Sequence, residues 1–333
     1  MKTALCDRLG IDYPIFSVGF GAAATAELAA AVSNAGACGV LGTAGLSPNW
    51  IRRELQRLQK LTSRPFGVNV ILAIRREGVI EACLDARPPL LVLFWGDATP
   101  WIDEAHRRGV KVFLQVGSVD EAKAAGAAGV DGIIAQGFEA GGHVKGRTSL
   151  AALLPAVVEA VRPVPVVAAG GIANGAGIVA ALSLGAQGVS LGTRFVASEE
   201  ANVPRAYKER IVAAAADETV YSELFDIGWP NAPHRTLKNK IVEEWEAAGR
   251  PPAGKRPGEG TAIGKVVRGE TTIDIPKYGA AMLTADFKGD PDYAPLWAGE
   301  SCGLVHDIKP AAEIVRSLVR EAEEAMSALN VTR

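Results

Sequence analysis

The sequence is poor in the residues that build metal centres and disulfide frameworks. Its 333 residues include only four cysteines and four histidines. The cysteines, at positions 6, 38, 83 and 302, form no C-x-x-C pair, which argues against a zinc site and against a disulfide scaffold. We therefore expect reduced thiols and no metal ion.

Long apolar runs and an excess of one charge are also missing. No stretch approaches the roughly 20 apolar residues that a membrane-spanning helix needs, and the first eight residues carry charges too early for a signal peptide. The formal net charge is −2, without long lysine or arginine blocks, which disfavours nucleic acids and anionic membranes as partners. We expect a cytoplasmic protein that acts on a small molecule.

The sequence contains eight short apolar runs that alternate with segments of helical spacing such as 27–34, 50–58, 120–125 and 152–161. Strands that alternate with helices indicate a parallel sheet, and eight such units that close on themselves form a (β/α)8, or TIM, barrel. An open doubly wound sheet is the alternative. The expected strands are 14–18, 38–41, 66–71, 90–95, 110–116, 132–135, 165–169 and 188–191.

The regular alternation stops after about residue 200. We predict that residues 1–216 and 302–333 form the barrel domain, and that 217–301, called the insertion below, packs over the barrel mouth as a smaller, mainly helical and irregular unit. The amphipathic segment 310–326 is expected to return as the eighth barrel helix.

Within and beside the insertion, helical pieces are expected near 205–216 and 236–248. The tract 251–260 is rich in proline and glycine and cannot pack a core of its own, so we expect a flexible or extended loop. A lid over the barrel mouth is the alternative interpretation of this tract.

The loop after the sixth expected strand carries a histidine behind two glycines. Residues 136–143 read Gln-Gly-Phe-Glu-Ala-Gly-Gly-His. The glycines let the backbone approach a flat ligand and leave the imidazole of His143 free, which suits a proton-transfer residue beside a cofactor. A glycine-rich surface turn is the alternative.

Two further glycine loops, 168–174 and 191–195, follow the seventh and eighth expected strands. Loops at these positions commonly form the phosphate site of a barrel. The helix expected from Gly177 can also offer its first N–H groups to an anion. Tight turns without any ligand are the alternative.

These loops carry a resemblance to a known family. The G-x-E-x-G-G-H pattern at 137–143, A-x-G-G-I-x-x-G at 168–175 and G-T-R-F at 192–195 occur in order. The sequence thereby resembles the nitronate monooxygenases, formerly called 2-nitropropane dioxygenases, which are barrel flavoenzymes. The resemblance extends from Ile11 to about residue 320 and is strongest over 125–200.

The resemblance implies that FMN lies across the barrel mouth. Asn69 and Gln115 match positions that meet the flavin ring or its ribityl chain, and both are polar residues in apolar strands. For Gln115, an internal hydrogen bond is the alternative. Gly170, Gly171, Gly192 and Thr193 are expected to hold the phosphate of FMN. The other residues expected to contact FMN are Gly137, Gly142 and Ala169.

The resemblance also implies that His143 is the catalytic residue above the flavin. There it can take the α-proton of a neutral nitroalkane or polarise the nitro group of a nitronate. The implied reaction consumes dioxygen and gives a carbonyl compound and nitrite. With an unperturbed pKa of about 6.5, His143 would make activity rise through neutral pH.

Two other activities stay open. NAD(P)H-dependent flavin reductases of the same barrel type, acting on enoyl thioesters or quinones, also carry a histidine in this loop, and each chemistry wants a proton-handling group near the flavin. A non-redox barrel that binds a phosphorylated metabolite is the third hypothesis. The oligomeric state is open as well, with a homodimer among the alternatives.

Candidate substrate contacts come from two places. In the loop 18–22, Gly19 is followed by Phe20, an aromatic residue where the monooxygenases often have methionine. His234 precedes a stretch that resembles the family only from Arg235 to Asn239, and a surface or helix-entry role is its alternative.

Four aromatic residues and one carboxylate have two interpretations each. Glu139 is expected to hydrogen-bond backbone amides of its own loop, rather than to act as a general acid. The aromatic residues either line an apolar substrate site or pack the insertion on the barrel. They are Trp95, Trp229, Trp297 and Tyr293.

Overall fold

Eight parallel strands form the central sheet of the computed structural model, which describes residues 1–268 and 271–331. Their hydrogen-bonded order is β1-β9-β8-β6-β5-β4-β3-β2, and a parallel bridge between Phe16 and Cys38 joins β1 to β2. The predicted TIM barrel is therefore confirmed, and the open doubly wound alternative is wrong. The strands are β1 (Ile15–Ser17), β2 (Gly39–Gly42), β3 (Phe66–Ile71), β4 (Leu90–Phe94), β5 (Lys111–Val116), β6 (Gly132–Gln136), β8 (Val166–Ala169) and β9 (Gly188–Leu191).

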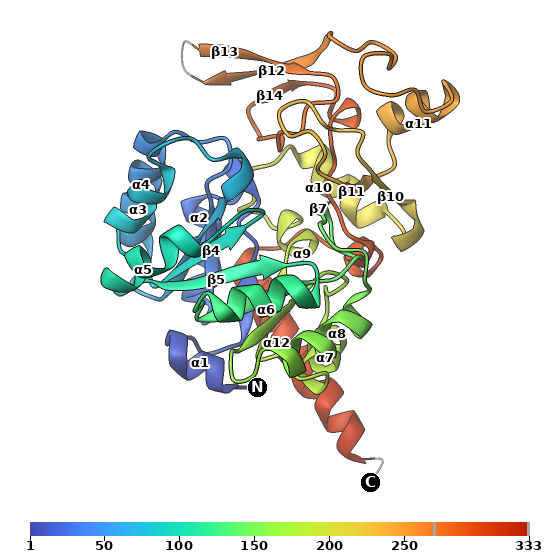
Figure 1. Cartoon of the computed structure of the whole chain (residues 1–333). Helices are drawn as coiled ribbons and strands as arrows, with labels where there is room; N and C mark the ends of the chain where they lie inside the picture. The colour runs from blue at the N-terminus through green and yellow to red at the C-terminus, as the bar shows by residue number, and fades with distance from the viewer. Residues whose placement is uncertain (269–270, 332–333) are drawn as a thin grey trace.

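Helices surround this barrel (Figure 1). The last of them, α12, packs beside α8 and α2 and supplies the eighth helix that the sequence predicted at 310–326. Local signals fix where helices begin: α3 starts with Pro48 directly after Ser47, whose hydroxyl accepts a hydrogen bond from the Trp50 N–H. The barrel helices are α2 (Ala26–Asn34), α3 (Pro48–Leu61), α4 (Val79–Asp85), α5 (Thr99–Arg107), α6 (Val119–Ala127), α7 (Leu150–Ala160), α8 (Gly175–Ser183) and α12 (Ala311–Val331).

The alternation of side chains along the strands separates two cores. Phe113 and Ile134 point into the barrel, whereas their neighbours Val112 and Ile133 pack against the helices. Helix α1 (Ala4–Leu9) closes the amino-terminal end of the interior with apolar side chains. Two residues beyond Phe113 and Ile134, the same inward direction carries Gln115 and Gln136 to the carboxyl end of the barrel.

The insertion contains more β-structure than the sequence predicted. Helices α10 (Arg205–Ala213) and α11 (Lys240–Ala247) occupy the expected helical pieces, but two small antiparallel sheets, β10-β11-β7 and β13-β12-β14, accompany them. The strands of the insertion are β10 (Thr219–Ser222), β11 (His234–Leu237), β12 (Ala262–Arg268), β13 (Thr271–Pro276) and β14 (Phe287–Gly289), and β7 (Gly142–His143) joins the first sheet from the histidine loop.

The sequence analysis did not predict these strands, and β11 shows why. Its sequence, His-Arg-Thr-Leu, lacks the apolar alternation of a strand, yet all four residues are buried because polar partners surround them. Residues 269–270 of the predicted insertion and 332–333 of the predicted barrel lie outside the described residues.

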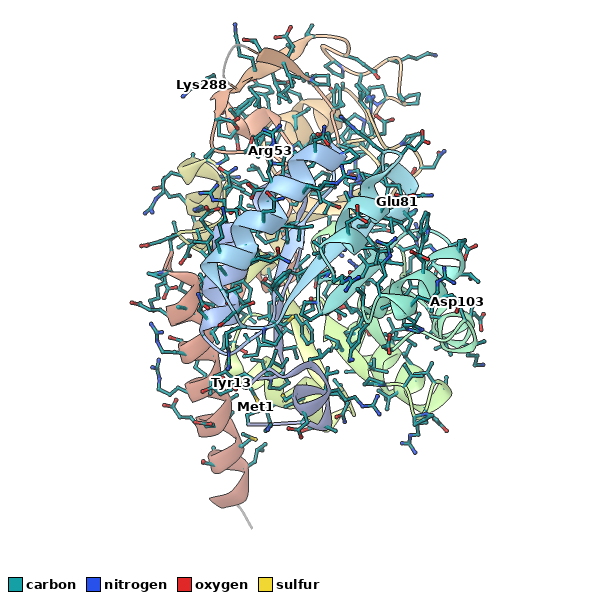
Figure 2. All side chains as sticks on the ribbon, turned by 90° about the vertical axis from the view of Figure 1, so that its left-hand side faces the viewer. Met1, Tyr13, Arg53, Glu81, Asp103 and Lys288 are labelled. Atoms are coloured by element: carbon teal, nitrogen blue, oxygen red, sulfur yellow. The ribbon has the colours of Figure 1, made fainter. Side chains whose placement is uncertain are left out.

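The insertion lies at the end of the molecule opposite α1 (Figure 1). Figure 2 shows the same arrangement from the side, with Lys288 near one end and Met1 and Tyr13 near the other. Within the described part of the chain, no helix has both the length and the apolarity required to cross a membrane. The tract 251–260 forms turns, as expected of a loop, and its Arg256 side chain is buried.

Candidate active site

The three glycine loops meet at the carboxyl end of the barrel because β6, β8 and β9 are neighbours in the sheet. The N–H of Gly137 donates to the carbonyl of Ala169 at 2.8 Å, which joins the first loop to the second. Gly170 has a φ of +97°, and a side chain there would place its Cβ 3.1 Å from the Gly137 carbonyl oxygen. Only glycine allows this close approach at a positive φ.

The second and third loops offer unpaired amides. No described residue accepts a hydrogen bond from the main-chain N–H of Gly170, Gly171, Gly192 or Thr193. The space beside Gly192 is open, since a Cβ there would meet nothing nearer than Val18, at 3.8 Å. Unpaired amides on adjacent loops are suited to an anion such as a phosphate group.

The start of α8 offers fewer such amides than predicted, because two of the first three N–H groups of this helix already have acceptors. Asn174 accepts the hydrogen bond of the Gly177 N–H at 2.9 Å, and the Glu321 carboxylate accepts that of Gly175, also at 2.9 Å. The helix cap and the neighbouring α12 have thus taken these donors.

Polar side chains form the upper layer of the barrel interior. Asn69 is buried, donates from Nδ2 to the Val92 carbonyl at 3.3 Å, and lies directly against Gly19, where a Cβ would come within 2.6 Å of the Asn69 Cβ. Gln115 is half-buried, and its amide forms no hydrogen bond with any described residue, contrary to the internal hydrogen bond considered as its alternative.

Gln136 belongs to the same layer, although the sequence analysis did not single it out. Its side chain is buried, Nε2 donates to the His143 carbonyl at 3.0 Å, and Oε1 is buried without a partner in the described structure. A buried amide oxygen without a partner costs free energy unless a ligand satisfies it. The strand alternation that brings Gln115 to the mouth also identifies Gln136.

His143 lies in an aromatic cluster. Strand β7 pairs with β11, which puts His143 opposite His234. The imidazole stacks on the Trp229 indole, with 3.9 Å between ring centroids and 26° between planes, and Trp297 and Trp95 follow at 5.1 and 6.1 Å. Three of the four aromatic residues considered above therefore surround His143, and the fourth, Tyr293, hydrogen-bonds Glu244 within the insertion.

Burial determines the charge of His143. Its Nε2 is buried without a hydrogen-bond partner among the described residues. Desolvation, with a smaller contribution from nearby His234, lowers the pKa of His143 from 6.5 to about 3. The imidazole is neutral at physiological pH, so the prediction that its titration makes activity rise through neutral pH is wrong.

His234 is a fixed neutral residue. It is fully buried in β11, which excludes the surface role. Nε2 accepts the Phe225 N–H at 3.2 Å, which leaves the proton on Nδ1 to donate to the Ala232 carbonyl at 2.9 Å. Burial lowers the pKa of His234 to about 4. Both nitrogens are bonded to main-chain groups, so the residue has a structural role in the described chain.

Arg235 ties the histidine loop to the insertion, and sequence reasoning missed it. Its guanidinium lies 4.8 Å from the Phe138 ring, donates to the Phe138 carbonyl at 3.0 Å and pairs with Glu300 at 3.1 Å. The Glu300 N–H in turn donates to the Glu139 carbonyl at 3.0 Å. The ion pair thus holds the loop from two sides.

Two predicted residues have structural contacts. The Glu139 carboxylate accepts the N–H of Leu150, the first residue of α7, at 3.0 Å, so it bonds a backbone amide beyond its own loop. Phe20 is half-buried against the outer core and is not among the described rings that contact His143. In the described chain, no group of three or more histidine, cysteine, aspartate or glutamate residues could hold a metal ion.

Fold and site together define an enzyme of the (β/α)8 class with its chemistry at the carboxyl ends of the strands. The family model described as nitronate monooxygenase matches residues 2–80 and 73–321. The chain therefore belongs to the nitronate monooxygenase family. Members of this family are flavin-dependent oxidoreductases, and the chain is an oxidoreductase of that kind.

Relatives with different names resemble the chain along its whole length. FabK from Thermotoga maritima is 32% identical, with a TM-score of 0.83 and complete coverage of both chains. A nitronate monooxygenase of Paraburkholderia phytofirmans is 29% identical over 98% of this chain and 97% of its own. A 5-hydroxy-7a-methyl-1-oxo-octahydro-1H-indene-4-carboxyl-CoA dehydrogenase of Mycobacterium tuberculosis is also 29% identical, over 97% and 96%.

Proposed function

We propose that this enzyme uses FMN and dioxygen to convert alkyl nitronates into carbonyl compounds and nitrite. The observation that carries the proposal is the neutral imidazole of His143, whose Nε2 is buried and unpaired at the barrel mouth. Such a group is prepared to hydrogen-bond a reacting nitro group without a net charge of its own.

The residues present fit FMN. The unpaired amides of Gly170, Gly171, Gly192 and Thr193 would hold its phosphate, and the unpaired Oε1 of Gln136, with Asn69 and Gln115 in the same layer, would meet its polar atoms. Gly137, Gly142 and Ala169 would border it with their backbone. When bound, FMN supplies the redox chemistry of the reaction.

The protonation state of His143 favours a nitronate over a neutral nitroalkane. A fall of the pKa from 6.5 to about 3 makes the imidazole a weaker base by about 5 kcal/mol. Removal of a carbon-bound proton needs a strong base, whereas an existing nitronate needs only orientation and a hydrogen bond. His143 therefore positions the nitronate, and the neighbouring indoles pack against its alkyl group.

NAD(P)H-dependent reduction of an enoyl thioester is the second candidate, supported by the similarity to FabK over the whole chain. In that reaction a histidine that delivers a proton to the substrate must first be protonated. A pKa of about 3 keeps His143 unprotonated at neutral pH, which favours the nitronate reaction.

An anaerobic experiment distinguishes the two candidates. The FMN-loaded protein is mixed with an alkyl nitronate, with the corresponding neutral nitroalkane, or with NADH or NADPH, and the flavin absorbance is followed. We expect rapid bleaching by the nitronate, slow bleaching by the nitroalkane, and nitrite release once oxygen is admitted. Rapid bleaching by a nicotinamide nucleotide, with the flavin left oxidised by nitronate, would overturn the proposal.

A further inference from the structure

We propose that Trp229 determines the size of the substrate by covering His143, and that Arg256 holds this indole in place through Asp226. The nature of the substrate, an alkyl nitronate, rests on the function proposed above. The covering of His143 by Trp229 does not depend on that function.

Trp229 is the ring in closest contact with the imidazole. Its centroid lies 3.9 Å from that of His143, and it forms an edge contact with Trp95 at 5.1 Å between ring centroids. Only 6% of Trp229 is exposed. Because the indole stacks on the imidazole and Nε2 is buried, a substrate that reaches Nε2 must fit beside Trp229 or displace it.

The other two indoles near His143 are held by the body of the protein. Trp95 directly follows β4 of the barrel. Trp297 is bridged to Thr236 of β11, and its carbonyl accepts the buried Tyr207 hydroxyl at 2.7 Å. Trp229, in contrast, lies on a turn of the insertion, in which Gly228 has a φ of +95° and Asn231 a φ of +55°. Its position therefore depends on how this turn is anchored.

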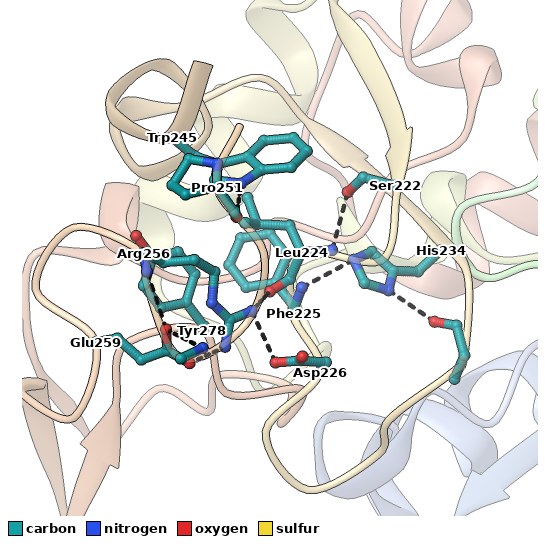
Figure 3. A network of polar contacts seen from close by, with 12 residues as sticks. Ser222, Leu224, Phe225, Asp226, His234, Trp245, Pro251, Arg256, Glu259 and Tyr278 are labelled. Carbon is teal, nitrogen blue, oxygen red and sulfur yellow. Dashed lines mark hydrogen bonds and ion pairs between the residues drawn. The ribbon is translucent and has the colours of Figure 1, made fainter. Parts of the chain in front are cut away.

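A buried arginine anchors the turn (Figure 3). The main-chain N–H of Trp229 donates to the main-chain carbonyl of Asp226 at 3.0 Å, and the Asp226 carboxylate pairs with Arg256 at 2.8 Å. The Arg256 side chain is 3% exposed, lies 4.3 Å from the Tyr278 ring centroid and donates to the Leu224 carbonyl at 2.7 Å. It also pairs with Glu259.

The proline- and glycine-rich tract 251–260 thus has a defined task. Its Arg256 reaches out of the tract to the segment 224–226, which leads directly into the Trp229 turn. Phe225, in the middle of this segment, donates its main-chain N–H to His234, the cross-strand neighbour of His143. The tract therefore stabilises the segment 224–226, which contacts both the Trp229 turn and His234.

The indole limits the alkyl group of the substrate. Stacked rings present an apolar surface, and in a close-fitting apolar pocket each additional methylene changes discrimination by about tenfold or more. We expect the wild-type enzyme to favour short-chain nitronates, with kcat/KM falling as the chain is lengthened. Replacement of Trp229 by alanine opens space where the longer chains are excluded.

The test compares Trp229→Ala and Trp229→Phe with Trp50→Ala in the FMN-loaded full chain. Trp50 is the matched control, because it lies on α3 of the barrel, is 42% exposed and is not among the described rings that contact His143. A series of primary alkyl nitronates gives kcat/KM against chain length. We expect Trp229→Ala to raise kcat/KM for the longer members at least tenfold relative to the shortest, and Trp50→Ala to leave the ratio unchanged.

A second readout does not need turnover. The rate at which diethylpyrocarbonate modifies His143, followed by peptide mass spectrometry, reports how well the imidazole is covered. We expect at least tenfold faster modification in Trp229→Ala, a smaller increase in Arg256→Gln, and wild-type protection in Trp229→Phe. If no variant or wild-type enzyme turns over nitronates but His143 is uncovered in Trp229→Ala, the proposed function fails and the covering stands. Unchanged modification and an unchanged chain-length profile in Trp229→Ala would overturn the inference.

Discussion

The ionisation of His143 gives a prediction that can be worked from the structure. Burial lowers the pKa of this imidazole to about 3, whereas in the unfolded chain it is about 6.5. Each pKa unit corresponds to about 1.4 kcal/mol, so the full difference between the two states is about 5 kcal/mol. The experiment lowers the pH and measures the free energy of unfolding.

The sign follows from which state binds the proton first. As pH falls below about 6.5, the unfolded chain protonates this histidine while the folded protein does not. Stability that is complete above about pH 6.5 is therefore lost progressively until about pH 3, where the folded protein also protonates. Between pH 6 and pH 4 the loss due to His143 is about 2.5 kcal/mol.

A His143→Gln variant isolates this contribution. Urea denaturation of wild type and variant at pH 7, 6, 5 and 4 should show that the wild type loses about 2.5 kcal/mol more than the variant between pH 6 and pH 4. The neighbouring His234, with a pKa of about 4, is present in both proteins and largely cancels. Parallel stability curves, together with an NMR titration of His143 centred near pH 6.5, would refute the reasoning.

Two further substitutions test the loops around the site. Gly170→Ala, at a φ of +97° and with its new Cβ against Ala140, should weaken FMN binding at least tenfold in a fluorescence titration. The control Gly109→Ala, at a φ of +75° with open space around it, should cost only about 1 kcal/mol of stability. Equal FMN affinities of the two variants would contradict the proposed phosphate site. Arg235→Gln should lower the free energy of unfolding by about 2–3 kcal/mol and reduce kcat, because the half-exposed Glu300 and the Phe138 carbonyl lose their partner. The control Arg205→Gln, at an exposed arginine, should change the free energy of unfolding by less than about 0.5 kcal/mol. Similar unfolding midpoints for the two arginine variants would argue against the Arg235 contacts.

The histidine loop shows how far local sequence leads. Gly-Gly-His at its place after a strand pointed to a reactive group, and the neighbouring glycine loops pointed to the same end of the barrel. The pKa of His143 could not be foreseen in the same way. It depends on Trp229 and Trp297, which lie 86 and 154 positions further along the sequence.

The polar residues of the site likewise divide into those that the sequence identifies and those that only the tertiary structure identifies. Asn69 and Gln115 stand out as polar residues inside apolar strands, and Gln136 carries the same signal at the end of β6. Arg235 carries no such signal, because its role arises when β11 pairs with β7 and places its guanidinium on Phe138. The amides at the start of α8 look available in the sequence until Glu321 of α12 occupies one of them.

The sequence by itself determined the barrel and the end of it that carries the chemistry, because the periods of strands and helices and the glycines after strands are local properties of the chain. The tertiary structure alone decided the strands of the insertion, the neutral state of His143 and the residue that covers it. These depend on burial and on partners from distant segments, and burial, rather than residue type, sets the free energy of a polar group.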